Sequence, residues 1–363
     1  MLLLIIIAVS ALAVYLFMRG AQFGKVPAGT RLQAIKQSPN YMDGQFHNLN
    51  LTPQLTDGAT MFSVMKSFFF GDKKRRRPAT VLPSQKTNLH TLDAGSNVLV
   101  WFGHSSYFMQ ADGKKILVDP VFSGNASPIK GTTKSFEGSD VYTADDMPVI
   151  DILFLTHDHW DHLDYPTLLK LKPKVKKIIT TLGVGAHLEY WGYDPSIIME
   201  GGWGSELIPA EGFRVNVTAA RHFSGRGFKR NGSLWASFVF TTPGMKIYLG
   251  GDSGYDTHFA ETGAKYGPFD LVILEDGQYN KSWKYIHMLP EEVVQAAIDL
   301  NAHMLLPVHW GKFSLSLHDW DEPIKRVVAE SKQRGVQLLH PMIGQVLDLN
   351  QPGVQEEWWV NLD

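Results

Sequence analysis

Residues 156–165, THDHWDHLDY, constrain the fold and chemistry of this chain more than any other stretch. Residues 149–155 before them are mostly apolar and β-branched or aromatic, which predicts a buried strand. A dense cluster of metal-ligand side chains therefore follows a strand end: His157, His159, Asp161 and His162. Because helix and strand periods spread side chains over several faces, we expect a loop that aims two of them at one ion and two at a neighbour. Imidazole and carboxylate ligands suit Zn²⁺, with Mn²⁺ or Fe²⁺ as alternatives.

The composition sets outer limits on the class of protein. With 363 residues, 44% of them hydrophobic, the chain can form one large domain or two smaller ones. The net charge of -2 provides no basic field, which argues against a nucleic-acid partner and against a nuclease. The absence of cysteine excludes disulfides, thiolate metal sites and a cysteine nucleophile.

The N-terminus is almost wholly apolar and has no charge before Arg19. This stretch is near the lower limit for a membrane span, roughly 17 residues. The basic residues follow the apolar run and none precedes it, so we predict an uncleaved single-pass anchor at residues 1–20. The positive-inside rule then locates the rest of the chain in the cytoplasm. The alternative is a signal peptide cleaved near residues 11–13, with a periplasmic domain.

Residues 21–90 lack a clear period, and we interpret them as a linker and an arm on the catalytic domain. Within this segment, the aromatic stretch 61–70 precedes the basic run 73–77. Apolar and basic residues side by side suit a membrane surface with anionic lipid. The alternatives are aromatic packing on the domain beside a solvated turn, or a nuclear localisation signal with no other support.

Residues 91–350 show regular patterns, and residues 351–363 form a C-terminal tail. We expect strands at 97–102, 106–110, 115–118, 149–155, 178–180, 213–220, 234–241, 245–249, 271–274, 304–308 and 336–339, and helices at 165–171, 184–191, 290–300 and 322–332. Strands form meanders early and alternate with helices later. This order predicts an α/β (α+β) domain in which helices cover two sheets of one sandwich.

Three more candidate ligands directly follow apolar strands: His222, Asp252 and His309. Seven such groups are more than one zinc ion needs, because a catalytic zinc takes three protein ligands and a water. Two ions with a shared carboxylate use all seven. His157, His159 and His222 then hold one ion, Asp161, His162 and His309 hold the other, and Asp252 bridges. A hydroxide between two such ions, about 3.5–4 Å apart, is the nucleophile.

This ligand pattern resembles the metallo-β-lactamase superfamily. Flanking segments are similar to one branch, the N-acylphosphatidylethanolamine-hydrolysing phospholipase D family: residues 101–106, 119–123, 126–128, 251–255, 266–271 and 309–311. The resemblance covers about residues 98–323. It implies a four-layer αββα sandwich and a dizinc site that hydrolyses a phosphodiester. Residues 129–138 and 275–280 depart from the family pattern.

The resemblance also suggests roles for individual side chains. His287 fits the family's substrate-side histidine, and either His287 or a metal-bound water is predicted to protonate the leaving group. Asp161 and Asp252 are the other predicted catalytic residues. We assign His104, Gln278 and Tyr279 to substrate binding alongside His287. Asp119 is expected to brace a loop or a ligand histidine, and Asp164 to cap the following helix. Five histidines are expected to be structural: His187, His258, His303, His318 and His340.

The predicted function is a membrane-associated dizinc phosphodiesterase of the phospholipase D type, acting on a phospholipid or another anionic diester. One alternative is a lactonase, or another ester or thioester hydrolase, on the same dimetal site. Another is a non-catalytic metal-binding membrane protein. The complete ligand set argues against this non-catalytic alternative. The sequence does not predict an oligomeric state.

Overall fold

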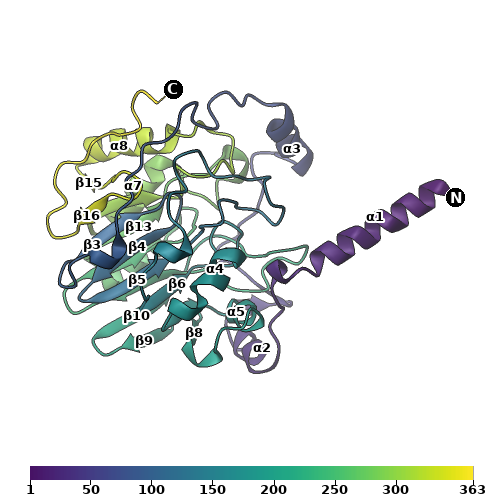
Figure 1. Ribbon diagram of the computed structural model, residues 1–363, viewed down its shortest axis with the longest axis horizontal. Helices are drawn as coiled ribbons and strands as arrows, with labels where there is room; N and C mark the ends of the chain where they lie inside the picture. Colours follow the sequence, from purple (N-terminus) through teal and green to yellow (C-terminus); the bar gives the residue numbers. More distant parts are fainter. Residues whose placement is uncertain (363) are drawn as a thin grey trace.

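The computed structural model describes residues 1–362 and contains two seven-stranded sheets (Figure 1). The first sheet has the order β16-β3-β4-β5-β6-β7-β8. Its strands are β3 Val98–Trp101, β4 Tyr107–Ala111, β5 Lys114–Val118, β6 Ile152–Leu155, β7 Ile178–Thr181, β8 Ile198–Gly201 and β16 Val346–Asp348. The second has the order β15-β14-β13-β12-β11-β10-β9. Its strands are β9 Glu206–Ala210, β10 Phe213–Thr218, β11 Ser237–Thr241, β12 Lys246–Leu249, β13 Phe269–Glu275, β14 Ala302–Val308 and β15 Gln337–Leu338.

Alternation along the strands builds the layers. In β6, Ile152 and Phe154 point into the core between the two sheets, whereas Leu153 and Leu155 point to the opposite face. Helices α4 (Tyr165–Leu171) and α5 (Gly185–Tyr190) pack on that outer face. Such a central strand is apolar on both faces because both are covered.

The second sheet is covered in the same way. Helices α6 (His258–Tyr266), α7 (Pro290–Asp299) and α8 (Glu322–Arg334) share a buried core with its outer face, through residues such as Phe259, Val293 and Val327. The result is the helix–sheet–sheet–helix arrangement that the sequence predicts. The expected strands and helices form with shifts at their ends, whereas β8, β9, β16 and α6 are additional.

The segment 21–90 is more structured than the sequence suggests. It contains α2 (Gly29–Lys36), the hairpin β1 (Tyr41–Met42) and β2 (Gln45–Phe46), and α3 (Met61–Phe70). Thr60 begins α3 with a capping box, in which its hydroxyl accepts from the Ser63 backbone and the Ser63 hydroxyl accepts from the Thr60 backbone. The arm therefore contributes a helix next to the domain.

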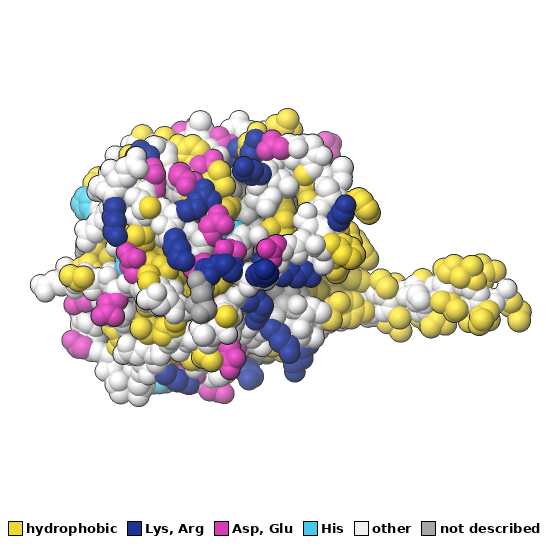
Figure 2. Space-filling view, turned by 90° about the horizontal axis from the view of Figure 1, so that it is seen from above, with side chains coloured by type: hydrophobic (Ala, Val, Ile, Leu, Met, Phe, Trp, Pro, Cys, Tyr) yellow, Lys and Arg dark blue, Asp and Glu magenta, His cyan; other side chains and the backbone are white. Residues whose placement is uncertain are grey.

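Helix α1, Leu2–Met18, extends away from the domain as an apolar rod (Figures 1 and 2). Along residues 1–362, every helix falls short of the length or the apolarity that a bilayer crossing requires. The predicted transmembrane anchor is therefore not supported. The physical reason is length, because 17 residues rise only about 25 Å, less than a hydrocarbon core of about 30 Å.

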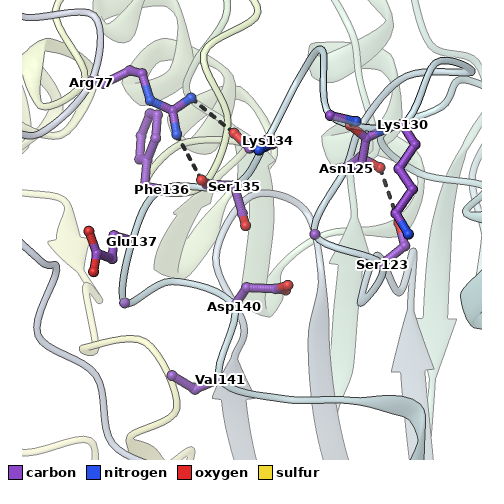
Figure 3. A pocket seen from close by; sticks show the side chains of 13 residues that line it. Arg77, Ser123, Asn125, Lys130, Lys134, Ser135, Phe136, Glu137, Asp140 and Val141 are labelled. Atoms are coloured by element: carbon purple, nitrogen blue, oxygen red, sulfur yellow. Dashed lines mark hydrogen bonds between the residues drawn. The ribbon is translucent and has the colours of Figure 1, made fainter.

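The basic run 73–77 separates into two parts. Lys73 and Lys74 are exposed. Arg75 pairs with Asp319 and Asp321, and Arg76 donates to the carbonyl of Ser67. Arg77 donates to the carbonyls of residues 134 and 135 at the rim of a surface pocket (Figure 3). Arg75 and Arg77 therefore attach the arm to the domain, Arg76 connects the run to α3 within the arm, and Lys73 and Lys74 face solvent.

Candidate metal centre

The candidate ligands come from loops at one edge of the sandwich, where several strands end. His157 to His162 follow β6, His222 follows β10, Asp252 follows β12 and His309 follows β14. Close packing at this edge explains one glycine. Gly251 has φ +60°, and a Cβ there would lie 3.0 Å from Thr156. The loop carrying Asp252 can therefore approach the β6 loop only with glycine at this position.

Three histidines form the first group, and their ring nitrogens converge. Nδ1 of His159 lies 2.9 Å from Nε2 of His157 and 3.1 Å from Nε2 of His222. Oδ2 of Asp252 lies 3.8 Å and 3.7 Å from the same two Nε2 atoms. The four groups offer one ligand atom each within 4.8 Å of one another.

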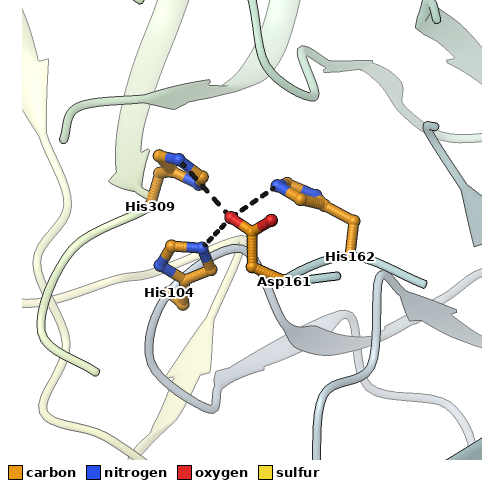
Figure 4. Close-up of side chains that lie close together, drawn as sticks. All are labelled: His104, Asp161, His162 and His309. Carbon is orange, nitrogen blue, oxygen red and sulfur yellow. Dashed lines mark hydrogen bonds and ion pairs between the residues drawn. The ribbon is translucent and has the colours of Figure 1, made fainter. Parts of the chain in front are cut away.

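The second group surrounds the carboxylate of Asp161 (Figure 4). Oδ2 of Asp161 lies 3.6 Å from Nε2 of His162 and 4.0 Å from Nε2 of His309. Nε2 of His104 donates a hydrogen bond to the same oxygen at 2.8 Å. Asp252 also faces this group, 3.1 Å from Nε2 of His162 and 3.3 Å from Nδ1 of His309. Asp252 thus lies between the two groups.

Hydrogen bonds from outside the cluster fix which ring nitrogens carry protons. Nδ1 of His222 donates to the carbonyl of Ile286 at 2.8 Å, and Nδ1 of His162 donates to Asp119 at 2.8 Å. Asp119 also accepts from the amide and the hydroxyl of Thr156. The Nε2 atoms of His162 and His222 therefore present lone pairs to the cluster. Carboxylates that orient ligand histidines in this way are usual in metal sites.

This donor set suits cations. Nε2 of His162 is buried without a hydrogen-bond partner, yet it lies 3.1 Å from Oδ2 of Asp252. A lone pair facing a carboxylate at this distance is repulsive unless a positive charge lies between them. Oδ1 of Asp252 is likewise buried and without a hydrogen-bond partner. Imidazole nitrogens and carboxylate oxygens together are typical ligands of divalent transition metals.

The pKa shifts agree with this chemistry. Burial lowers the pKa of His157, His222 and His309 well below the ordinary value, so these rings are neutral and able to bind metal. Burial opposes ionisation of Asp252, but the neighbouring His162 lowers the pKa of this carboxyl to about 2. His162 is the exception: burial opposes its protonation, but the carboxylates of Asp252, Asp161 and Asp119 raise its pKa well above the ordinary value. The cluster therefore combines three neutral imidazoles with an ionised Asp252 and with one ring, His162, beside which a positive charge is favoured.

Comparison with known proteins identifies the family. A sequence profile described as "Beta-lactamase superfamily domain" matches residues 114–310, more than half of the chain. The chain belongs to the beta-lactamase superfamily. It is accordingly a metal-dependent hydrolase. An uncharacterized protein of Mycobacterium tuberculosis is 38% identical over 330 residues, which cover 89% of this chain and 88% of that protein.

Two further comparisons bear on the branch and on the fold. The mitochondrial N-acyl-phosphatidylethanolamine-hydrolyzing phospholipase D of Saccharomyces cerevisiae is 31% identical over 242 residues, which cover 62% of this chain and 50% of that protein. The resemblance drawn from the motifs is thereby confirmed for the superfamily and supported for the branch. Igni18, a metallo hydrolase from Ignicoccus hospitalis, shares the fold at 19% identity, with a TM-score of 0.54, over 69% of this chain and 97% of that one.

His104 lies inside the second group of this hydrolase and is fully buried. It has φ +54°, and His309 has φ +70°, so both lie in the left-handed region that non-glycine residues rarely adopt. Their backbones are joined, since the amide of His309 donates to the carbonyl of His104 at 2.9 Å. The unusual conformations thus occur where two loops from different sheets meet at the metal centre.

His287 lines the cleft above the cluster, and its Nδ1 donates to Oε2 of Glu275 at 2.9 Å. Glu275 is completely buried, and its other oxygen accepts from the amide of Met288. Burial raises the pKa of Glu275 to about 7. The Glu275 carboxyl therefore orients His287. No role was predicted for Glu275 from the sequence.

The other two predicted substrate residues are held by protein contacts. Gln278 lines the cleft, but its side-chain amide binds the backbone of His309, Phe313 and Leu315. The hydroxyl of Tyr279 donates to Glu322, and Tyr279 is not among the residues that line the cleft in the described part of the chain. Asp164 precedes α4, but its carboxylate binds the Thr167 hydroxyl and the Ser123 amide, so it joins two loops.

Two supporting residues were missed. Asn48 bonds to the backbone of His222, and the hydroxyl of Ser105 lies 2.8 Å from Nδ1 of His309. Ser105 stands next to His104 in the Trp-Phe-Gly-His block, and this position is the one sequence signal that pointed to it. Asn48 carries no comparable signal, because its partner lies far away in the sequence.

A cleft of about 590 Å³ opens onto the centre. Leu55, Trp283 and Ile286 form part of its apolar wall. Helix α3 supplies more of that wall through Met61, Val64 and Phe68. These three positions lie on one face of the helix. The site therefore combines a polar floor of candidate metal ligands with an apolar side.

Proposed function

We propose that this hydrolase cleaves a phosphodiester bond in a phospholipid, at a centre that holds two zinc ions. One observation carries the proposal: α3 lines the metal cleft with one face and exposes an apolar face to solvent. On the exposed face, Phe62, Phe69 and Phe70 are 79%, 64% and 84% accessible. A solvent-facing aromatic cluster at the mouth of a cleft is typical of contact with lipid.

The residues of the two groups would hold the ions, with Asp252 between them. When bound, two divalent ions activate a water for attack and stabilise negative charge on the phosphate oxygens. Asp161 holds its place through the hydrogen bond from His104. His287, which Glu275 orients, is the proton donor for the leaving alcohol.

The same proposal extends to the membrane surface. The exposed apolar side chains of α1 and the exposed face of α3 contact lipid without crossing the bilayer, while Lys73 and Lys74 attract anionic headgroups. Figure 2 supports this orientation, because further hydrophobic side chains lie on the part of the domain from which α1 projects. The similarity to the yeast phospholipase D is a second line of support.

The test is headgroup release from vesicles of defined phospholipids by zinc-loaded full-length protein. Bis(p-nitrophenyl) phosphate, a lactone panel and a thioester panel are assayed in parallel. We expect release of a phosphorylated or free headgroup together with diester turnover. Turnover of lactones or thioesters without any diester hydrolysis would reassign the reaction, and no turnover of any substrate by metal-loaded protein would favour a binding role.

A further inference from the structure

Arg230 differs from the other arginines around the metal centre because it is exposed and also has no acidic partner within residues 1–362. Arg221 lies 3.5 Å from Asp256, and the buried Arg226 donates to backbone carbonyls of the metal loop. Among the described residues, Arg230 donates a hydrogen bond to the side-chain oxygen of Gln54 and to no other group. Its positive charge is therefore uncompensated and accessible to a ligand.

The location of Arg230 links this charge to the site. Its guanidinium carbon lies 5.1 Å from the ring centre of Phe223. That ring is in turn 4.4 Å from the ring of His159 and 4.8 Å from the ring of His222. Of the described residues that line the cleft, Arg230 is the one lysine or arginine. One aromatic ring thus separates a free guanidinium from two candidate metal ligands.

We propose that Arg230 selects phosphodiesters in which the esterified alcohol carries a second anionic group. This inference rests on the proposed function, because it assumes that the metal centre holds the diester phosphate. A carboxylate or phosphate a few bonds away then reaches the guanidinium, which binds such groups through two parallel N–H donors. A quaternary ammonium in the same place is repelled. The favoured lipids therefore have acidic headgroups, and choline lipids are disfavoured.

A simpler role for Arg230 is attraction to an anionic membrane as a whole. That role predicts an effect on vesicle binding with no effect on selectivity among small soluble substrates. The two roles therefore separate in an assay without lipid. Lys229 provides a matched control, because it is the next residue, carries the same charge and lines a different pocket at the root of α1.

The experiment compares two p-nitrophenyl phosphodiesters with the same leaving group, whose second alcohol is 3-hydroxypropionate or choline. For the zinc-loaded wild type, we expect kcat/KM to be roughly tenfold higher for the carboxylate, as for a charge pair in a partly exposed site. Arg230→Glu should reverse the preference, whereas Lys229→Glu should leave the ratio within about twofold of wild type. Using the ratio cancels any general effect of the new charge on phosphate binding.

An unchanged ratio in Arg230→Glu overturns the inference, and so does an equal change in Lys229→Glu. Calorimetric binding of phosphocholine and of O-phospho-3-hydroxypropionate to the zinc-loaded proteins gives a readout without turnover. If the wild type hydrolyses neither diester, the proposed function fails, while the binding preference still decides the role of Arg230. If wild type and Arg230→Glu each bind the two ligands with equal affinity, the proposed role of Arg230 is rejected.

Discussion

Asn48 holds the backbone of His222 from both sides: its Oδ1 accepts from the His222 amide at 3.1 Å, and its Nδ2 donates to the His222 carbonyl at 2.8 Å. The indole of Trp235 donates to the same Oδ1 at 3.1 Å. A residue of the N-terminal arm is therefore part of the support of a candidate metal ligand. Supporting residues of this kind orient the ligands that they contact.

Replacing Asn48 with Ala should weaken metal binding. The loss of both backbone hydrogen bonds frees His222 to move, and such changes cost roughly tenfold to a hundredfold in metal affinity. The measurement is metal retained after dialysis against graded chelator. Asn50→Ala is the control, because that amide binds Asp256, which is not among the candidate ligands. Asn48→Asp keeps the acceptor and loses the donor, so its metal retention should lie between those of Asn48→Ala and Asn50→Ala. Equal retention in Asn48→Ala and Asn50→Ala would remove Asn48 from the metal centre.

Elemental analysis of protein purified without chelator should find close to two transition-metal ions per chain. Asp252→Ala should lower this content more than His309→Ala, because Asp252 faces both groups and His309 faces one. His309→Ala should keep about one ion, because the three histidines of the first group are enough protein ligands for a zinc ion. A fully active wild type with a single ion would contradict the two-ion centre.

The exposed lysines of the basic run should contribute to lipid binding, whereas Arg75 should contribute to stability. Lys73→Ser with Lys74→Ser is expected to weaken sedimentation with anionic vesicles about tenfold at low salt, since each charge near an anionic surface is worth about 1 kcal/mol before screening. Turnover of a soluble diester should match wild type. A double variant of the exposed Lys170 and Lys265 controls for net charge.

Arg75→Ser tests the other half of the run. It removes a partner from Asp321, which is 2% exposed, so we expect a lower melting temperature with little change in vesicle binding. Thermal unfolding followed by circular dichroism gives the first quantity. A normal melting temperature combined with weak vesicle binding would assign Arg75 to the lipid surface.

Acid sensitivity should depend in part on His258 in α6. Burial lowers the pKa of His258 to about 4, while an unfolded chain titrates near about 6.5. As pH falls, the unfolded state takes up this proton first, so the contribution to stability is complete above pH ~6.5 and is lost between ~6.5 and ~4. Between pH 7.5 and 4.5 the wild type should therefore lose on the order of 2 kcal/mol more than His258→Gln.

Urea midpoints at several pH values measure this difference. The exposed His303 provides the control, because His303→Gln removes a histidine whose side chain is 65% accessible. The same pH dependence in His258→Gln and in wild type would show that other groups govern acid unfolding.

The clustering of the candidate ligands was predictable because these residues follow strands whose patterns are strong. His157, His222, Asp252 and His309 each come after an apolar run, and parallel neighbours bring such strand ends to one edge. Contacts between distant segments leave no such trace. Nothing in the sequence near Asn48 points to His222, and nothing near Glu275 specifies that its carboxylate accepts from His287.

Two of the elements that were not predicted, α3 and β9, were missed for different reasons. The signal for α3 was present in Thr60 and Ser63, but its aromatic run obscured the helical period. Strand β9 has a half-exposed pattern that includes Pro209, so it does not resemble a core strand. For helix α1, in contrast, the apolar composition was plain from the sequence. The predicted membrane span was nevertheless not supported, because the helix is too short.

The clamp between Asn48 and His222 also has a kinetic consequence. These residues are 174 positions apart in the chain, so the arm leaves the ribosome long before its partner exists. Contacts of such large sequence separation form late in folding, because the entropy of closing the loop must be overcome first. The three histidines of the loop after β6 are synthesised early, but the centre closes only when β10, β12 and β14 have joined their sheet. A nascent chain therefore presents these imidazoles to the surrounding solution before the pocket that determines their geometry has formed.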